Sequence, residues 1–170
     1  MPTRTRAAAN LDPDHPNRAA GIIAALSPQT SWPRNLGLAA RMYADGRLNG
    51  GALSRSVTRA TAIYHGAEPL NVLQGPKTRA FYRLIADPDD PDTVCIDRHA
   101  IDVAVGERLS VLDRESRYPL NRHNWYERFA TVYRAAARQL AVTPSVVQAT
   151  TWTVQTDRWR DIRIGGLTHI

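Results

Sequence analysis

Lys77 is the side chain of this sequence that is best suited to act as a nucleophile, because it is the single lysine among 22 basic residues. Arginine can replace lysine at a phosphate contact, but it cannot act as a neutral amine or form a Schiff base. Lys77 follows Gly75-Pro76, a tight turn leading into a proline suited to the first position of a helix. We expect Lys77 in that helix's first turn, where the dipole favours the neutral amine. The alternative is that Lys77 simply extends into solvent.

Asp97 lies twenty residues further on, after the apolar segment Val94-Cys95-Ile96 and at the expected start of another helix. Aspartate is a favoured N-cap, and capping alone would account for it. Capping would also keep the carboxylate ionised while the helix dipole drives Lys77 toward neutrality. Two titratable groups driven in opposite directions are typical of an acid/base or nucleophile pair. For His99 we expect a buried ring bonded to a backbone carbonyl.

The elements that position these residues are all expected to be helices, because Gly and Pro interrupt the chain at helical rather than strand spacing. The expected helices cover residues 17–26, 31–45, 53–64, 77–86, 97–105, 125–140 and 144–159, with Thr143 as an N-cap and one further turn over 68–73. Residues 87–92 are expected to form a solvated loop, and residues 93–96 to return to the interior. No helix is assigned to residues 114–124. The sequence therefore predicts an all-α fold.

The amino-acid composition excludes several classes of protein and of metal site. A chain of 170 residues with 43% hydrophobic and 22% charged residues predicts one compact unit. No apolar run approaches the roughly 20 residues that span a bilayer, and no signal peptide is recognisable, so we expect a cytoplasmic protein without a membrane partner. Cys95 is the single cysteine, which excludes an intramolecular disulfide, a cysteine-held iron–sulfur cluster and a CxxC zinc site. We expect no cofactor and no metal.

The net charge of +6 favours a polyanionic partner such as nucleic acid. Large aromatic residues usually carry packing. The four tryptophans, Trp32, Trp125, Trp152 and Trp159, are therefore expected in the core or between lobes rather than stacked on bases.

Three motifs together resemble the helix-hairpin-helix DNA glycosylase superfamily, which includes the endonuclease III and 8-oxoguanine glycosylase types. The turn ending in Gly75-Pro76-Lys77 resembles the family's hairpin, in which Leu73 stands where the first glycine usually is. The helix start at Asp97-Arg98-His99 resembles the family's apolar-Asp-x-His segment. Upstream, residues 25–30 (Ala-Leu-Ser-Pro-Gln-Thr), followed by Asn35, resemble the family's L-S-x-Q-T segment. The resemblance spans residues 22–106.

This resemblance implies a minimal glycosylase without an iron–sulfur cluster. Its two helical lobes would be a barrel of residues 22–106 and a second lobe of residues 1–21 plus 107–170, with the pocket between them. The implied reaction is excision of a modified or damaged base flipped out of duplex DNA. Lys77 would attack the anomeric carbon of the sugar, giving glycosylase and abasic-site lyase activity, and Asp97 would stabilise the positive charge on the sugar. We expect a monomer.

The resemblance also implies residues that contact DNA. Gln29 would occupy the space vacated in the duplex, and Arg34 and Arg79 would contact phosphates. Gly75, Thr78 and His99 complete the expected DNA-binding set. Two alternatives remain open: a phage-type enzyme that modifies bases on the same scaffold, and a noncatalytic DNA-binding helical protein in which Lys77 could be arginine.

Overall fold

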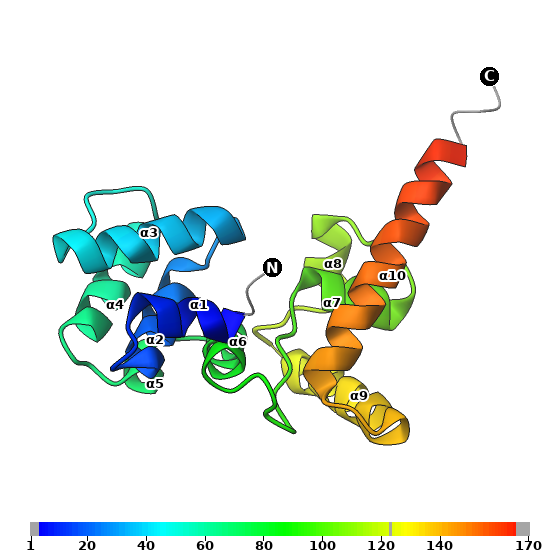
Figure 1. Cartoon of the computed structure of the whole chain (residues 1–170). Coiled ribbons are helices and arrows are strands. Elements are labelled where there is room, and N and C mark those ends of the chain that lie inside the picture. Colours follow the sequence, from blue (N-terminus) through cyan, green and yellow to red (C-terminus); the bar gives the residue numbers. More distant parts are fainter. Residues whose placement is uncertain (1–3, 123, 166–170) are drawn as a thin grey trace. The chain divides into compact units, whose positions relative to one another are not determined.

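The computed structural model of the chain describes residues 4–122 and 124–165, and the side chains of residues 5–122 and 124–155. Every regular element in these ranges is an α-helix, which confirms the predicted all-α class (Figure 1). The helices are α1 (Arg4–Leu11), α2 (Pro16–Leu26), α3 (Trp32–Asp45), α4 (Ser54–Tyr64), α5 (Pro69–Val72), α6 (Pro76–Ala86), α7 (Arg98–Val105), α8 (Val111–Arg117), α9 (Trp125–Leu140) and α10 (Pro144–Gly165).

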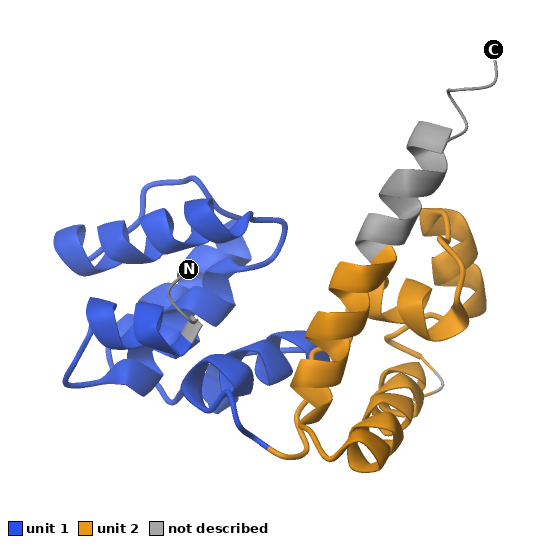
Figure 2. Cartoon of the chain, turned by 45° about the vertical axis from the view of Figure 1, so that its right-hand side comes forward, with its two compact units in different colours: residues 1–90 blue, residues 91–170 orange. Residues whose placement is uncertain are grey.

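Two compact units divide the chain, residues 1–90 and residues 91–170 (Figure 2). The division differs from the expected lobes, in which residues 1–21 were grouped with 107–170 and residues 91–106 with the barrel. The packing of two helices explains the difference. Helix α1 packs against α2, α3 and α6, and α7 packs against α9 and α10.

The first unit is built around α2, whose residues from Ala19 to Leu26 are all buried. Every other helix of the unit packs against it. Close approach depends on Gly21, where a Cβ atom would lie 2.7 Å from Pro69 Cγ and 3.2 Å from Ile63 Cγ2. A side chain on that face would push α4 and α5 away from the central helix.

The second unit has its own core, formed by the segment before α7 together with α7, α9 and α10. Its buried residues include Ile96, Ile101, Phe129, Tyr133 and Val147. Helix α8 contributes no buried residue. The second unit therefore holds Asp97 at the edge of a core that is separate from the one beneath Lys77.

The helix boundaries expected between residues 17 and 105 agree with the structure to within about one residue. The Gly46 C-cap and the Pro76 helix start are at the expected positions. Helices α1 and α8 were not predicted, because both are short and neither shows a long apolar period. No helix in the described ranges is both long and apolar enough to cross a bilayer.

The tryptophans only partly follow the expectation of burial. Trp32 is half-buried with its ring edge-on to Phe81, and Trp125 is half-buried beside Phe129. Trp152 is 44% exposed on α10, so of the two expected places the core is excluded for this residue, and a place between lobes stays a prediction. The side chain of Trp159 lies outside the described residues.

Candidate functional site

Lys77 is the second residue of α6, so its predicted place in the first turn of a helix is confirmed. Gly75 precedes the helix with φ of 80°, in the region that favours glycine. Pro76 fills the first helical position, where a missing N–H costs no hydrogen bond. The Lys77 side chain is exposed, and the half-buried Thr78 follows it.

Two arginines hold the turn before Lys77. Arg79 donates from Nε to the Leu73 carbonyl and from Nη2 to the Leu70 carbonyl, both at 2.9 Å. Arg59 of α4 donates from Nη2 to Gln74 Oε1 at 2.5 Å. From the sequence we expected Arg79 to contact a DNA phosphate. In the structure its guanidinium donates to carbonyl oxygens at the end of α5. Its contacts in the structure fix the turn that precedes Lys77.

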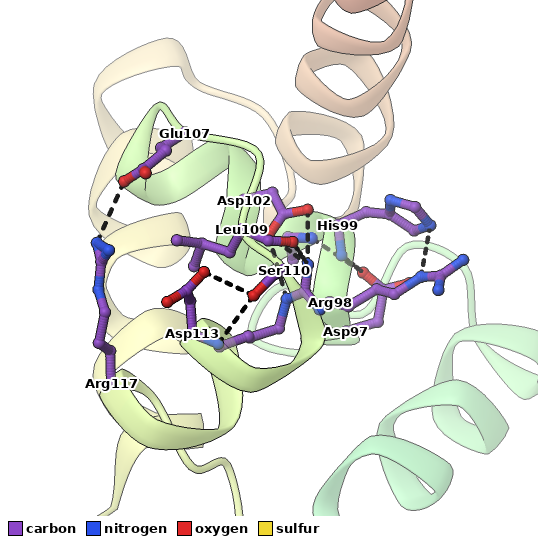
Figure 3. Close-up of polar contacts among 11 residues, drawn as sticks. Asp97, Arg98, His99, Asp102, Glu107, Leu109, Ser110, Asp113 and Arg117 are labelled. Carbon is purple, nitrogen blue, oxygen red and sulfur yellow. Dashed lines mark hydrogen bonds and ion pairs between the residues drawn. The ribbon is translucent and has the colours of Figure 1, made fainter.

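Asp97 is the N-cap of α7, as the sequence predicted. Its Oδ1 accepts both capping hydrogen bonds, from the backbone N–H of His99 at 3.0 Å and from that of Ala100 at 2.9 Å (Figure 3). Oδ2 accepts no hydrogen bond from any residue in the described part of the chain. The half-buried side chain thus combines a fixed orientation with one carboxylate oxygen outside the cap.

The segment before Asp97 is held by side chains from the end of the chain. The Tyr126 hydroxyl accepts from the Ile96 N–H at 3.2 Å and donates to the Val94 carbonyl at 3.0 Å. Gln148 Nε2 donates to the Cys95 carbonyl at 2.6 Å. Burial, followed by the neighbouring Cys95, raises the pKa of Tyr126, which keeps the hydroxyl protonated and able to donate. Sequence reasoning missed both residues.

His99 is half-buried, and its Nε2 accepts a hydrogen bond from Arg98 Nε at 3.2 Å (Figure 3). This side-chain partner replaces the backbone carbonyl expected from the sequence. The ring also lies edge-on to Trp152, with centroids 6.0 Å apart. Burial lowers the pKa of His99, against the opposing effect of Asp97, so the neutral ring is favoured.

A buried ion pair joins α7 to α8. Asp102 is 3% exposed, and its carboxylate accepts from Arg114 Nε at 3.1 Å and from Nη2 at 2.8 Å. Arg114 Nη2 also donates to the Leu109 carbonyl at 2.8 Å. Both charges therefore have partners, which a buried pair requires. This pair holds α8 against α7, and its Asp102 lies in the same helix that Asp97 caps.

The remaining predicted DNA contacts lie in the first unit. Gln29 is exposed in the turn between α2 and α3, with φ of 58°, a conformation that residues with a side chain adopt infrequently. Arg34 is exposed and donates from Nη2 to the Gly51 carbonyl at 3.0 Å. The buried Asn35 donates from Nδ2 to the Ile23 carbonyl at 2.9 Å, which ties the two helices flanking the Gln29 turn.

The structure thus gathers Gly75, Lys77, Thr78 and Arg79 at one helix start in the first unit. Asp97 and His99 share another helix start in the second unit. It does not bring Lys77 and Asp97 together within one unit. No group of three His, Cys, Asp or Glu side chains that could hold a metal occurs among the residues described.

Comparison with known proteins places the chain in a family. A model described as "Family of unknown function (DUF7178)" matches residues 4–161. Since this match covers most of the 170 residues, the chain belongs to that family. Neither a curated protein nor a solved structure matches the chain.

Proposed function

We propose that this member of the DUF7178 family is a DNA glycosylase that excises a modified or damaged base, with Lys77 as nucleophile and Asp97 as the catalytic carboxylate. One observation carries the proposal. Asp97 makes both capping bonds through Oδ1 and leaves Oδ2 outside the cap. A residue that served only to cap α7 would need no more than that one oxygen. The carboxylate thus has a fixed position, and its second oxygen can face a reacting centre whose positive charge it would stabilise.

The chemistry divides between the two side chains. After the target nucleotide is flipped out, the neutral Lys77 amine forms a bond to the anomeric carbon while the bond to the base breaks. The base leaves with the electron pair and takes up a proton. Asp97 stabilises the positive charge on the sugar and accepts a proton from the attacking amine. The nitrogen lone pair then breaks the bond between the anomeric carbon and the ring oxygen, which takes the proton from Asp97, and a Schiff base on Lys77 results.

The proposal includes a two-lobed, glycosylase-like arrangement in which both helix starts face the flipped nucleotide. Gln29 supports a DNA-binding role for its own turn, because strained left-handed residues other than glycine often occur at functional positions. Gln29 would fill the gap in the duplex. Gly75, Thr78 and His99 would contact the DNA near the two helix starts. The protein would act as a cytoplasmic monomer.

Borohydride trapping on duplex DNA with an abasic site tests the proposal. Wild-type protein should form a covalent adduct, and Lys77→Arg should bind the DNA without forming one. A matched control adds Arg83→Lys, which is exposed later in the same helix, to the Lys77→Arg variant. This protein again has one lysine, but it should not be trapped.

Equal trapping of wild type and Lys77→Arg would contradict the proposal, because another amine would then be the nucleophile. A panel of duplexes with one modified base each identifies the excised base. Binding without trapping or excision on any duplex would instead favour a noncatalytic DNA-binding protein. Conversion of a base without release would favour the base-modifying enzyme.

A further inference from the structure

The charges of the first unit are unevenly distributed along its sequence. Residues 15–67 contain six arginines and a single carboxylate, Asp45. Arg18 pairs with Asp12 at 2.7 Å. The other five, Arg34, Arg41, Arg47, Arg55 and Arg59, lie within ion-pair distance of no carboxylate in the described part of the chain. The middle of this unit thus carries positive charge that the described residues do not neutralise.

Two of these arginines meet at the connection between α3 and α4. We call residues 46–53 the glycine loop, which runs back along α3 (Figure 1). Arg34 donates to the Gly51 carbonyl at 3.0 Å. A Cβ atom on Gly51 would lie 3.1 Å from Arg41 Nη2, so the Arg41 guanidinium reaches the same glycine. Both arginines are exposed, and the loop holds Arg34 in place before any ligand binds.

The glycine loop also presents backbone donors. Gly50 and Gly51 have φ of 84° and 88° and are exposed. The N–H groups of residues 47–53 form no hydrogen bond with another described residue. Successive backbone N–H groups beside left-handed glycines are a recurrent way of binding anions.

Helix α4 continues the positive surface toward Lys77. Arg55 and Arg59 are four residues apart and therefore lie on one face of α4. Arg59 contacts Gln74, three residues before Lys77. In the second unit three arginines form ion pairs, whereas Arg108, Arg122, Arg128 and Arg138 lie within ion-pair distance of no carboxylate in the described part of the chain. Arg114, Arg117 and Arg134 each pair with a carboxylate.

We infer that the glycine loop, with Arg34 and Arg41, is a second binding site for the DNA phosphate backbone, linked to the turn before Lys77 by Arg55 and Arg59. The choice of DNA rests on the proposed function, whereas the site itself rests on the contacts of the first unit. Guanidinium groups bind phosphate oxygens through paired N–H donors, and the site adds affinity without reading sequence.

The test measures the affinity of the full chain for an unmodified DNA duplex as a function of salt. The variant Arg34→Gln/Arg41→Gln removes two charges at the glycine loop. Its control, Arg108→Gln/Arg138→Gln, removes two charges from exposed arginines of the second unit that form no ion pair among the described residues. Both variants have the same net charge, so that a difference between them reports where the charge lies.

Each lost phosphate contact reduces the slope of log affinity against log salt by about 0.9. Between 50 and 200 mM salt, wild type should therefore lose about tenfold more affinity than the loop variant. The control should keep the wild-type slope. A third variant, Gly51→Ala, keeps every charge but displaces Arg41 and strains the loop, and it should also weaken binding. Circular dichroism and urea unfolding identify any variant that is not folded.

Equal slopes for the loop variant and its control would overturn the inference, because net charge alone would then set the affinity. The inference would also be overturned if a folded Gly51→Ala protein bound DNA as well as wild type and the loop variant kept the wild-type slope of log affinity against log salt. The same measurements distinguish failure of this second site from failure of the proposed glycosylase activity. Salt-dependent binding that needs Arg34 and Arg41, without trapping at Lys77, supports this site and removes the glycosylase. If wild type did not bind DNA at low salt, both the phosphate site and the glycosylase activity would be contradicted. If it bound duplex RNA more strongly than duplex DNA, the proposal that the ligand is DNA would be contradicted.

Discussion

Gln148 of α10 donates a hydrogen bond of 2.6 Å to the backbone carbonyl of Cys95, a residue 53 positions earlier in the chain. Together with the two bonds of Tyr126, it gives polar partners to a segment beside which the described part of the chain places no strand. Asp97 begins its helix at the end of this segment. Residues far beyond the helix therefore determine where the carboxylate lies.

Tyr126→Phe should loosen that segment. The change removes both hydroxyl bonds and leaves the Ile96 N–H and the Val94 carbonyl without them, which costs about 1–3 kcal/mol. Hydrogen exchange of the His99 and Ala100 amides, which Asp97 binds, should become faster. The control is Tyr43→Phe, which loses one bond to Asp12 in the first unit. If that control accelerated exchange at His99 equally, the effect would be general destabilisation.

Asp97 variants should separate capping from catalysis. Asp97→Asn keeps an oxygen that can accept the two backbone bonds, so its stability should remain close to that of wild type, whereas Asp97→Ala should lose about 1 kcal/mol. Base excision should fall in both, because the loss of a preorganised charge costs about 3–4 kcal/mol of barrier. Urea unfolding and single-turnover excision provide the two measurements. Normal turnover by Asp97→Asn would leave Asp97 as a cap only.

Acidification should destabilise the folded protein through His99. Burial lowers the pKa of His99 below its ordinary value of 6.5 in the folded state. The unfolded chain then binds the additional proton first, so the contribution of this group is present above pH 6.5 and is lost as the pH falls through the folded pKa. Urea unfolding between pH 7.5 and 5 should show a smaller decline for His99→Gln than for wild type. A decline unchanged by the substitution would show that other groups dominate.

Arg79→Gln should weaken the turn before Lys77. The Leu70 and Leu73 carbonyls lose their guanidinium donors, for which we expect a loss of about 1–3 kcal/mol in unfolding free energy. Arg83→Gln removes the same charge from the same helix at an exposed position, and should change stability by no more than about 0.5 kcal/mol. Similar losses in both variants would indicate that Arg79 acts through charge rather than through these bonds.

Two glycine substitutions in neighbouring helices should have opposite effects. Gly21→Ala places a methyl group 2.7 Å from Pro69 Cγ, so the first unit should lose about 1–3 kcal/mol. Gly37 lies on the exposed side of α3, and a Cβ atom added there would have no neighbouring atom within 4 Å. Because alanine has the higher helix propensity, Gly37→Ala should stabilise the first unit by about 0.5–1 kcal/mol. Thermal unfolding of both variants checks the pair. A stable Gly21→Ala protein would mean that α5 moves away at little cost.

The fold was predictable where breakers and caps act locally. Gly46 ends α3 in the left-handed conformation, Pro76 begins α6, and Asp97 caps α7, each within a few residues of the signal that predicts it. Helix α8 was missed, because its seven residues bury none of their side chains and so leave no apolar period. Its position depends on Arg114 reaching Asp102, a contact between helices.

The site was predictable in its residues but not in their surroundings. Lys77 and Asp97 occupy the expected helix starts, whereas the hydrogen bonds of Arg79 to the Leu70 and Leu73 carbonyls were not predicted. Tyr126 and Gln148 carry no sequence signal, since their partners are peptide groups 30 to 53 residues away. Only the packing of the second unit shows these pairs.

The way in which the segment before Asp97 is bound has a consequence for evolution. Its partners contact peptide groups, which every residue type provides, and the side chains of Val94 and Ile96 pack in the core of the second unit. Val94 and Ile96 should therefore accept other apolar residues of similar volume during divergence. Tyr126 and Gln148 should tolerate few replacements. Selection on the position of Asp97 would then be visible mainly in the last third of the chain, far from the carboxylate in sequence.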